Sequence, residues 1–131
     1  MATRIRVLLA DDSNPMRDAI GTLLKTEPAI TVIGEVSTYR DLLKELDGST
    51  LDVILMDIHM PGLRDSDSFK DVLRRFCILG MSFWTNEETS RIAAEFGVVQ
   101  LLDKGNLVST LIPAIKECAR QGGALGGTVA I

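Results

Sequence analysis

The sequence contains few of the residues that build thiol, zinc and aromatic sites. Its 131 residues include two cysteines, one histidine, one tryptophan and one tyrosine. Cys77 and Cys118 lie far apart, and neither has a second cysteine or a histidine at the spacing of a zinc site. We therefore predict that both are buried free thiols, in preference to a disulfide or a zinc site.

Long hydrophobic runs and an excess of positive charge are also missing. No apolar stretch approaches the roughly 20 residues that a membrane-spanning helix needs, and the N-terminus has no secretory signal pattern. The formal net charge of −4 provides no basic field to hold a nucleic-acid backbone. These absences predict a cytoplasmic protein, with no contact to membranes and no direct nucleic-acid binding by this segment.

Short apolar runs alternate with helical patterns along the whole chain. Residues 4–10 form an apolar run that ends in two aspartates, and apolar residues then recur at helical spacing from Asn14 onward. The alternation is repeated four more times. We predict further strands near residues 30–36, 53–57, 77–82 and 98–102, and further helices near residues 39–47, 67–75, 87–96 and 107–121. Strict alternation predicts an α/β domain with a parallel sheet covered by helices on both faces.

Several local features bear on where the helices begin and end. We expect Asn14 to cap the first helix with Pro15 at its first position, Thr38 to cap the second, and Thr85 with Glu88 to cap the fourth. Pro113 would make the last helix begin later or bend. The glycine-rich residues 122–131 suit a flexible tail or a truncated linker, so that the domain itself covers residues 1–121.

Polar side chains stand at the ends of four predicted strands. The carboxyl ends of neighbouring parallel strands open onto one crevice, so we expect these side chains to meet there. They are Asp11, Asp12, Asp57, Ser82 and Lys104. Crowded carboxylates need a compensating cation, and hard oxygen ligands suit Mg²⁺. Taken alone, the first two aspartates could be only a capping turn before a helix.

This set of residues predicts phosphoryl chemistry. A carboxylate such as that of Asp57 can attack phosphorus and form an acyl phosphate if the charge on the transferring group is neutralised. A metal ion and the ammonium of Lys104 would neutralise it, and the Ser82 hydroxyl can bond another phosphoryl oxygen. We predict Asp57 as the nucleophile.

In their order and spacing these residues resemble the receiver domains of bacterial-type response regulators, from residue 4 to about residue 121. The resemblance rests on the acidic pair Asp11-Asp12, the run from Met56 to Gly62, Ser82, and Lys104 after Leu-Asp. It implies a flavodoxin-like (CheY-like), doubly wound three-layer α/β/α fold with five parallel strands in the order 2-1-3-4-5. It also implies phosphorylation of Asp57, Mg²⁺ bound by Asp11, Asp12, Asp57 and the main-chain carbonyl of His59, and a switch coupled through Ser82.

The chain departs from the family pattern at several positions. We expect the switch position that works with Ser82 to be Leu101. The family usually has an aromatic residue there, whose ring turns inward as the hydroxyl residue moves, so Leu101 leaves open whether this rotating-ring form of the switch operates. Phe83 and Trp84, which we expect to pack or to form a partner surface, replace small or polar residues. The stretch between Asp57 and Ser82 is short, which predicts a trimmed third helix or loop. For His59 we expect a neutral, solvent-facing ring, with the hypothesis that it modulates hydrolysis of the acyl phosphate.

The resemblance implies a role in two-component phosphorelay signalling. The phosphodonor would be a histidine kinase or a phosphotransfer protein, and phosphorylation could form a homodimer or control an output domain. The segment Val-Ile-Gly-Glu-Val-Ser resembles receivers that precede helix-turn-helix output domains in transcription regulators. Such a domain is not a conventional enzyme and at most catalyses its own phosphorylation and dephosphorylation.

Three other classes of protein are alternatives to a receiver domain. A flavodoxin needs a phosphate loop after the first strand, where this chain has two aspartates that repel phosphate without a metal. A haloacid-dehalogenase-type phosphatase needs a second aspartate two positions after its nucleophile, where this chain has His59. The alternative that we retain is a receiver-like interaction module that is not phosphorylated.

Overall fold

A computed structural model describes residues 4–46, 50–62, 68–84 and 86–129, without the side chains of residues 68, 69 and 122–129. One five-stranded parallel sheet in the order β2-β1-β3-β4-β5 forms its centre. The strands are β1 (Ile5–Ala10), β2 (Ile30–Val36), β3 (Val53–Asp57), β4 (Cys77–Ser82) and β5 (Val98–Asp103). The helices are α1 (Asn14–Leu24), α2 (Tyr39–Leu46), α3 (Ser68–Leu73), α4 (Glu87–Glu95) and α5 (Leu107–Val129), with a 3-10 helix η1 (Lys104–Asn106).

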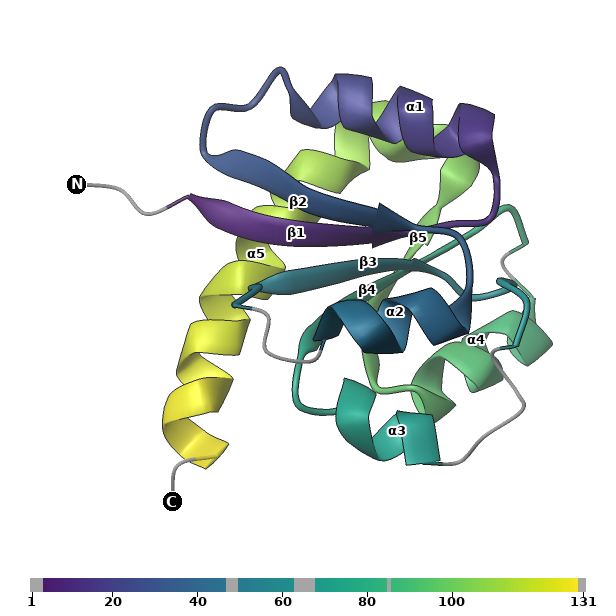
Figure 1. Ribbon diagram of the computed structural model, residues 1–131, viewed down its shortest axis with the longest axis vertical. Coiled ribbons are helices and arrows are strands. Elements are labelled where there is room, and N and C mark those ends of the chain that lie inside the picture. Colours follow the sequence, from purple (N-terminus) through teal and green to yellow (C-terminus); the bar gives the residue numbers. More distant parts are fainter. Residues whose placement is uncertain (1–3, 47–49, 63–67, 85, 130–131) are drawn as a thin grey trace.

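The helices cover the sheet on both faces, which confirms the predicted three-layer flavodoxin-like fold (Figure 1). On one face, α1 and α5 pack on the sheet through Ile20, Leu111 and Ile115. On the other face α2, α3 and α4 contribute Leu42, Leu73 and other residues to a second apolar cluster. The central strands are buried on both sides because their side chains point alternately into the two clusters.

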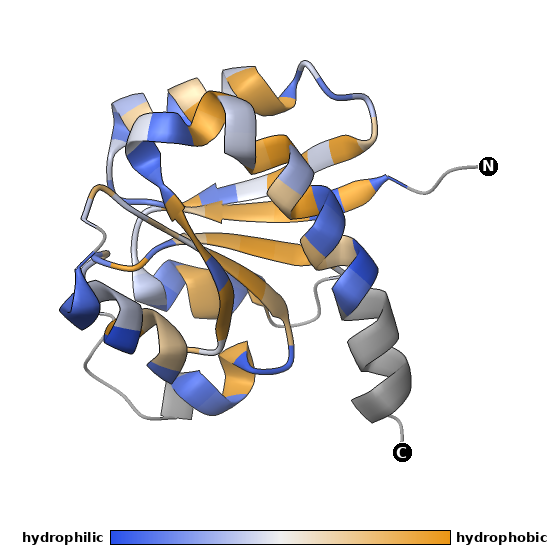
Figure 2. Cartoon of the chain, turned by 180° about the vertical axis from the view of Figure 1, so that it is seen from behind, coloured by the Kyte–Doolittle hydropathy of each residue, from blue (hydrophilic) through white to orange (hydrophobic). Residues whose placement is uncertain are grey.

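The hydropathy of the chain follows these layers. Every residue of β3 and β4 is buried, whereas the edge strands β2 and β5 keep exposed positions. Figure 2 shows strands that are mostly hydrophobic, with some hydrophilic positions, between helices that carry hydrophilic segments.

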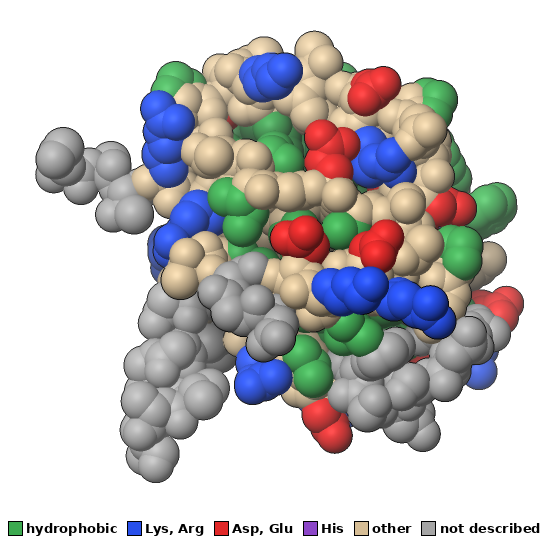
Figure 3. Space-filling model, viewed as in Figure 1, with side chains coloured by type: hydrophobic (Ala, Val, Ile, Leu, Met, Phe, Trp, Pro, Cys, Tyr) green, Lys and Arg blue, Asp and Glu red, His purple; other side chains and the backbone are tan. Residues whose placement is uncertain are grey.

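On the face over α1, β2 and α2, acidic and basic side chains lie side by side (Figure 3). That face therefore presents charges of both signs. Among the described residues, no helix has the length and apolarity that a membrane span requires.

Two of the predicted helix caps are replaced by neighbouring residues. The Ser13 side chain, rather than Asn14, accepts the Met16 N–H at the start of α1. Asn86 caps α4 by accepting the Thr89 N–H, and Thr85 lies outside the described residues. The Thr38 cap is confirmed, because its hydroxyl accepts the Asp41 N–H. Consecutive polar residues can each cap a helix, and the direction from which the chain enters decides between them.

The last helix is longer than the sequence predicted. It begins at Leu107 and runs through Pro113 to Val129, so it does not start later as the proline suggested. Residues 122–129, predicted as a tail or a linker, continue this helix, and residues 130 and 131 lie outside the described part of the chain. The domain boundary at residue 121 stays a prediction. Helix α3 is described over six residues, and residues 63–67 before it lie outside the described part, so the trimmed third helix or loop stays a prediction.

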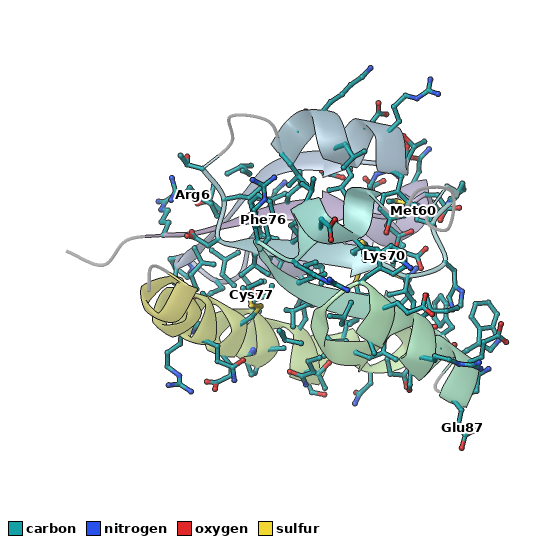
Figure 4. The ribbon with its side chains drawn as sticks, turned by 90° about the horizontal axis from the view of Figure 1, so that it is seen from below. Arg6, Met60, Lys70, Phe76, Cys77 and Glu87 are labelled. Atoms are coloured by element: carbon teal, nitrogen blue, oxygen red, sulfur yellow. A yellow bond between two sulfur atoms is a disulfide. The ribbon has the colours of Figure 1, made fainter. Side chains whose placement is uncertain are left out.

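The prediction of free thiols is wrong, because Cys77 and Cys118 form a disulfide. Their Cα atoms lie 6.1 Å apart, within the range that a disulfide spans. The sulfurs join the first residue of β4 to α5 inside the core, and only 6% and 1% of the two residues are exposed (Figure 4). Burial was predicted correctly. The pairing was missed because it depends on how α5 lies across the sheet, which residue spacing along the chain does not reveal.

Candidate functional site

Three aspartates gather at the carboxyl edge of the sheet. β1 and β3 are neighbours in register, with Ala10 beside Met56, so Asp11 and Asp57 follow at the same level. Each of Asp11, Asp12 and Asp57 offers a carboxylate oxygen within 4.8 Å of the others. Asp11 and Asp57 are buried and Asp12 is exposed. The strand order therefore brings together the acidic residues predicted from the sequence.

Lys104 reaches the same place from beyond the end of β5. Its ammonium lies 2.7 Å from Asp11 Oδ2 and 3.3 Å from Asp57 Oδ2, and only 6% of its side chain is exposed. The Asp103 side chain accepts the Gly105 N–H, which fixes the turn into η1 that carries the lysine. One buried ammonium thus bridges two buried carboxylates.

The environment of Asp57 disfavours its charged form. Burial raises the pKa of the Asp57 carboxyl above its ordinary value, and the neighbouring charge of Asp11 adds to this increase. The main-chain N–H of His59, which donates to Asp57 Oδ1 at 2.9 Å, and the Lys104 ammonium offset it in part. A further cation at this position would favour the carboxylate form.

The donor set fits a hard divalent cation such as Mg²⁺. Three carboxylates face one ammonium, which leaves uncompensated negative charge at the site. All three side chains offer oxygen atoms, the ligands that Mg²⁺ prefers. Exposed Asp12 leaves the outer side open to water molecules and to a ligand, as Mg²⁺ coordination requires.

Ser82 ends β4 beside this cluster and is only 1% exposed. Its Oγ accepts the Trp84 N–H at 2.9 Å and lies 3.1 Å from Nε2 of His59. The residue predicted to contact a phosphoryl group is thus already hydrogen-bonded to two neighbours.

Two aromatic residues and His59 form the rim of the site. The His59 ring meets the Trp84 ring edge to face, with 5.1 Å between the ring centres. The Lys104 ammonium lies 5.5 Å from the centre of the Phe83 ring. Phe83 and Trp84 are 56% and 58% exposed, so they are surface residues. Sequence reasoning missed these contacts, although the position of both residues directly after Ser82 was the signal.

Leu101, predicted as a switch position, packs into the sheet face. It pairs with Gly80 of β4, two residues before Ser82. A Cβ atom on Gly80 would lie 3.3 Å from Leu101 Cδ1 and 3.0 Å from Ile58 Cγ2, so the glycine makes room for both side chains. Leu101 is partly buried against the cluster under α2, α3 and α4.

The amino-acid sequence of the chain matches a known protein family. The family model of the response regulator receiver domain matches residues 7–116. The chain therefore belongs to the receiver domain family of two-component response regulators, whose signalling runs through a phosphorelay.

Individual relatives agree with this assignment. The chain is 32% identical over 120 residues to the uncharacterized transcriptional regulatory protein YxjL of Bacillus subtilis, with 89% of this chain and 55% of the relative covered. It is also 32% identical over 108 residues to a protein-glutamate methylesterase/protein-glutamine glutaminase of Halalkalibacterium halodurans, with 79% and 31% covered. The chain thus spans about a third to a half of the length of these curated relatives.

Solved structures share the fold at low sequence identity. The response regulator domain of Thermotoga maritima CheB has a TM-score of 0.76 at 23% identity, with 89% of this chain and 97% of that chain covered. The non-phosphorylated receiver domain of the stress response regulator RcsB from Escherichia coli has a TM-score of 0.76 at 18% identity, with 92% and 95% covered.

Proposed function

We propose that Asp57 is the phosphoacceptor of this receiver domain and that a histidine kinase or a phosphotransfer protein is the phosphodonor. Mg²⁺ would be held by Asp11, Asp12 and Asp57 together with the main-chain carbonyl of His59. The observation that carries the proposal is the Lys104 ammonium between the buried carboxylates of Asp11 and Asp57. A buried cation beside a buried, charge-disfavoured carboxylate prepares the site for an incoming anion.

Both oxygens of Asp57 have partners in the resting domain. Oδ1 accepts the His59 N–H, and Oδ2 faces Lys104. Attack on phosphorus forms a bond from one of these oxygens while the bond from phosphorus to the donor nitrogen breaks. Lys104 then moves its ammonium from the carboxylate to a phosphoryl oxygen, and the Ser82 hydroxyl bonds another. The metal ion, when bound, neutralises charge on the transferring group.

The test is the intact mass of the protein after treatment with acetyl phosphate and MgCl₂. We expect one added phosphoryl group in the parent and none in Asp57→Asn, because an amide does not replace the carboxylate as nucleophile. Asp52→Asn is the matched control: Asp52 pairs with Arg6 at a distance of 3.5 Å on the partly exposed opposite edge, so its adduct should equal that of the parent. A parent that gains no adduct would instead support the non-phosphorylated interaction module.

Asp57→Asn is also expected to stabilise the domain when no divalent cation is present. The pKa of the folded Asp57 is raised, mainly by burial, so the unfolded carboxyl ionises at lower pH than the folded one. Ionised Asp57 therefore destabilises the fold at neutral pH, and the variant lacks this penalty. The advantage of the variant should shrink as the pH falls through the raised pKa, where the parent becomes protonated.

Urea unfolding with and without MgCl₂ measures both effects. At about 100 times its dissociation constant, Mg²⁺ should stabilise the parent by about 2.7 kcal/mol and the Asp57→Asn variant by less. A variant that is less stable than the parent in EDTA at neutral pH would contradict the expected penalty.

The location in the cell, the output domain and the oligomeric state involve more of the protein than the site residues. We propose a cytoplasmic regulator in which this domain controls a helix-turn-helix output domain, since the relative YxjL is named a transcriptional regulatory protein and the chain spans about half of it. Homodimer formation on phosphorylation is part of the same proposal. Sedimentation of the acetyl-phosphate-treated domain tests it.

A further inference from the structure

We propose that His59 is a positioning residue for Ser82: its imidazole holds the Ser82 hydroxyl in the resting domain and releases it to the phosphoryl group, which alters the contact between His59 and Trp84. The inference rests on the proposed function, because it needs a phosphoryl group on Asp57. It gives the His59 side chain a role different from the hydrolysis hypothesis, and it makes Trp84 the surface group that responds.

The role of His59 follows first from the hydrogen bonds that the Ser82 hydroxyl can make. A hydroxyl has one hydrogen and two lone pairs. One lone pair of Oγ receives the Trp84 N–H at 2.9 Å. Among the hydrogen bonds of the described residues, the acceptor within reach of the hydroxyl hydrogen is His59 Nε2, which lies 3.1 Å from Ser82 Oγ. A hydroxyl that is 1% exposed needs such an acceptor.

These hydrogen bonds predict the resting tautomer of the imidazole. If Nε2 accepts from Ser82, its hydrogen must be on Nδ1. In that state Ser82 has no hydrogen left to donate to a phosphoryl oxygen. Contact with a phosphoryl group therefore requires the hydroxyl to turn away from His59. Either the ring then moves, or the hydrogen shifts to Nε2 and the ring becomes the donor.

The contact between His59 and Trp84 connects Ser82 to the protein surface. The imidazole packs edge to face on Trp84 with the ring planes at 85°, and Trp84 is 58% exposed. The indole thus contacts the ring that must respond to Ser82, and its own main-chain N–H is bonded to the same hydroxyl. Leu101 instead fills space beside Gly80 with an aliphatic side chain. In this proposal the aromatic response comes from His59 and Trp84, which contact Ser82 directly.

The chain offers an unusually clean experiment, because it has one histidine and one tryptophan. With ¹⁵N-labelled histidine, the two ring nitrogens give one pair of signals that report the tautomer, measured at one fixed alkaline pH. We expect hydrogen on Nδ1 and none on Nε2 in the resting domain. Addition of beryllofluoride and MgCl₂, which mimic the phosphoryl group and its metal ion, should shift the Nε2 signal and change Trp84 fluorescence.

Three variants separate positioning from simple packing. Ser82→Ala should abolish the shift of the Nε2 signal. His59→Leu keeps an apolar contact on Trp84 but offers no acceptor, so it should lose the fluorescence response. His59→Gln can place its side-chain oxygen near the position of Nε2 and should restore that response. A purely structural role would be served better by leucine than by glutamine.

The experiments distinguish failure of the proposed role of His59 from failure of the proposed phosphorylation of Asp57. A resting imidazole with hydrogen on Nε2 overturns the role of His59 without any phosphoryl mimic. Beryllofluoride that shifts the main-chain amide signals of Asp57 and Lys104 while leaving Nε2 unchanged also overturns it, and leaves the proposed function standing. Failure of beryllofluoride to shift any signal at the site overturns both.

Discussion

Replacing Lys104 with methionine will destabilise the domain by about 3–5 kcal/mol in the absence of a divalent cation, the usual effect of removing one partner from a buried ion pair. Methionine keeps most of the apolar length of lysine but lacks the ammonium. Asp11 and Asp57, which are 0% and 5% exposed, would then face one another without the charge that lies 2.7 and 3.3 Å from them. Urea unfolding in EDTA measures the loss.

Magnesium should restore part of the stability of Lys104→Met, because a divalent cation compensates the same carboxylates. The variant should nevertheless accept a phosphoryl group from acetyl phosphate about 10²–10³ times more slowly, as when one donor to a developing charge is removed. Lys116→Met is the matched control: Lys116, whose side chain is 49% exposed, pairs with partly exposed Glu27, and the loss of an exposed ion pair is worth about 1 kcal/mol or less. Equal losses in the two variants would show that burial of Lys104 has no energetic consequence.

Reducing the disulfide between Cys77 and Cys118 is expected to lower the free energy of unfolding by about 4 kcal/mol. The two cysteines are 41 residues apart, and a cross-link over such a loop restricts the unfolded chain by about that amount in the chain-entropy description. The reduced and oxidised forms have the same core atoms apart from two hydrogens, so their comparison isolates the cross-link from packing.

The measurement is urea unfolding of the oxidised domain and of the same protein after reduction, with the mass of each form determined first. The double variant Cys77→Ala, Cys118→Ala serves as the control, since its stability should not depend on the reductant. Unfolding curves that coincide for the oxidised and reduced parent would contradict the expected stabilisation.

The elements that the sequence predicted well are those determined by local patterns. The apolar runs of β3 and β4 were assigned to the observed residues because buried parallel strands are apolar on both faces. Asp11, Asp57 and Lys104 were found together because each ends a strand or directly follows one, and the strand order brings those ends to one edge. For these residues, knowing the topology was enough to predict proximity.

What the sequence did not predict depends on the direction of individual side chains. Ser13 and Asn14 are both suitable caps, and only the entry angle of the chain selects Ser13. The disulfide depends on the packing of α5 across β4, and the bond between His59 and Ser82 depends on a ring after β3 that reaches the end of the neighbouring strand β4. The predicted solvent-facing His59 is exposed as expected, yet its Nε2 contacts a buried hydroxyl. Residue types and spacings are the same whether or not these contacts form.

The disulfide has a topological consequence for the half of the domain that carries the switch residues. The covalent ring from Cys77 to Cys118 contains Ser82, Trp84, Leu101 and Lys104, together with α4 and β5. A single peptide bond cut by a protease in the exposed turn at Phe83 and Trp84 would therefore leave the two pieces attached to each other. They would separate on a denaturing gel only after reduction.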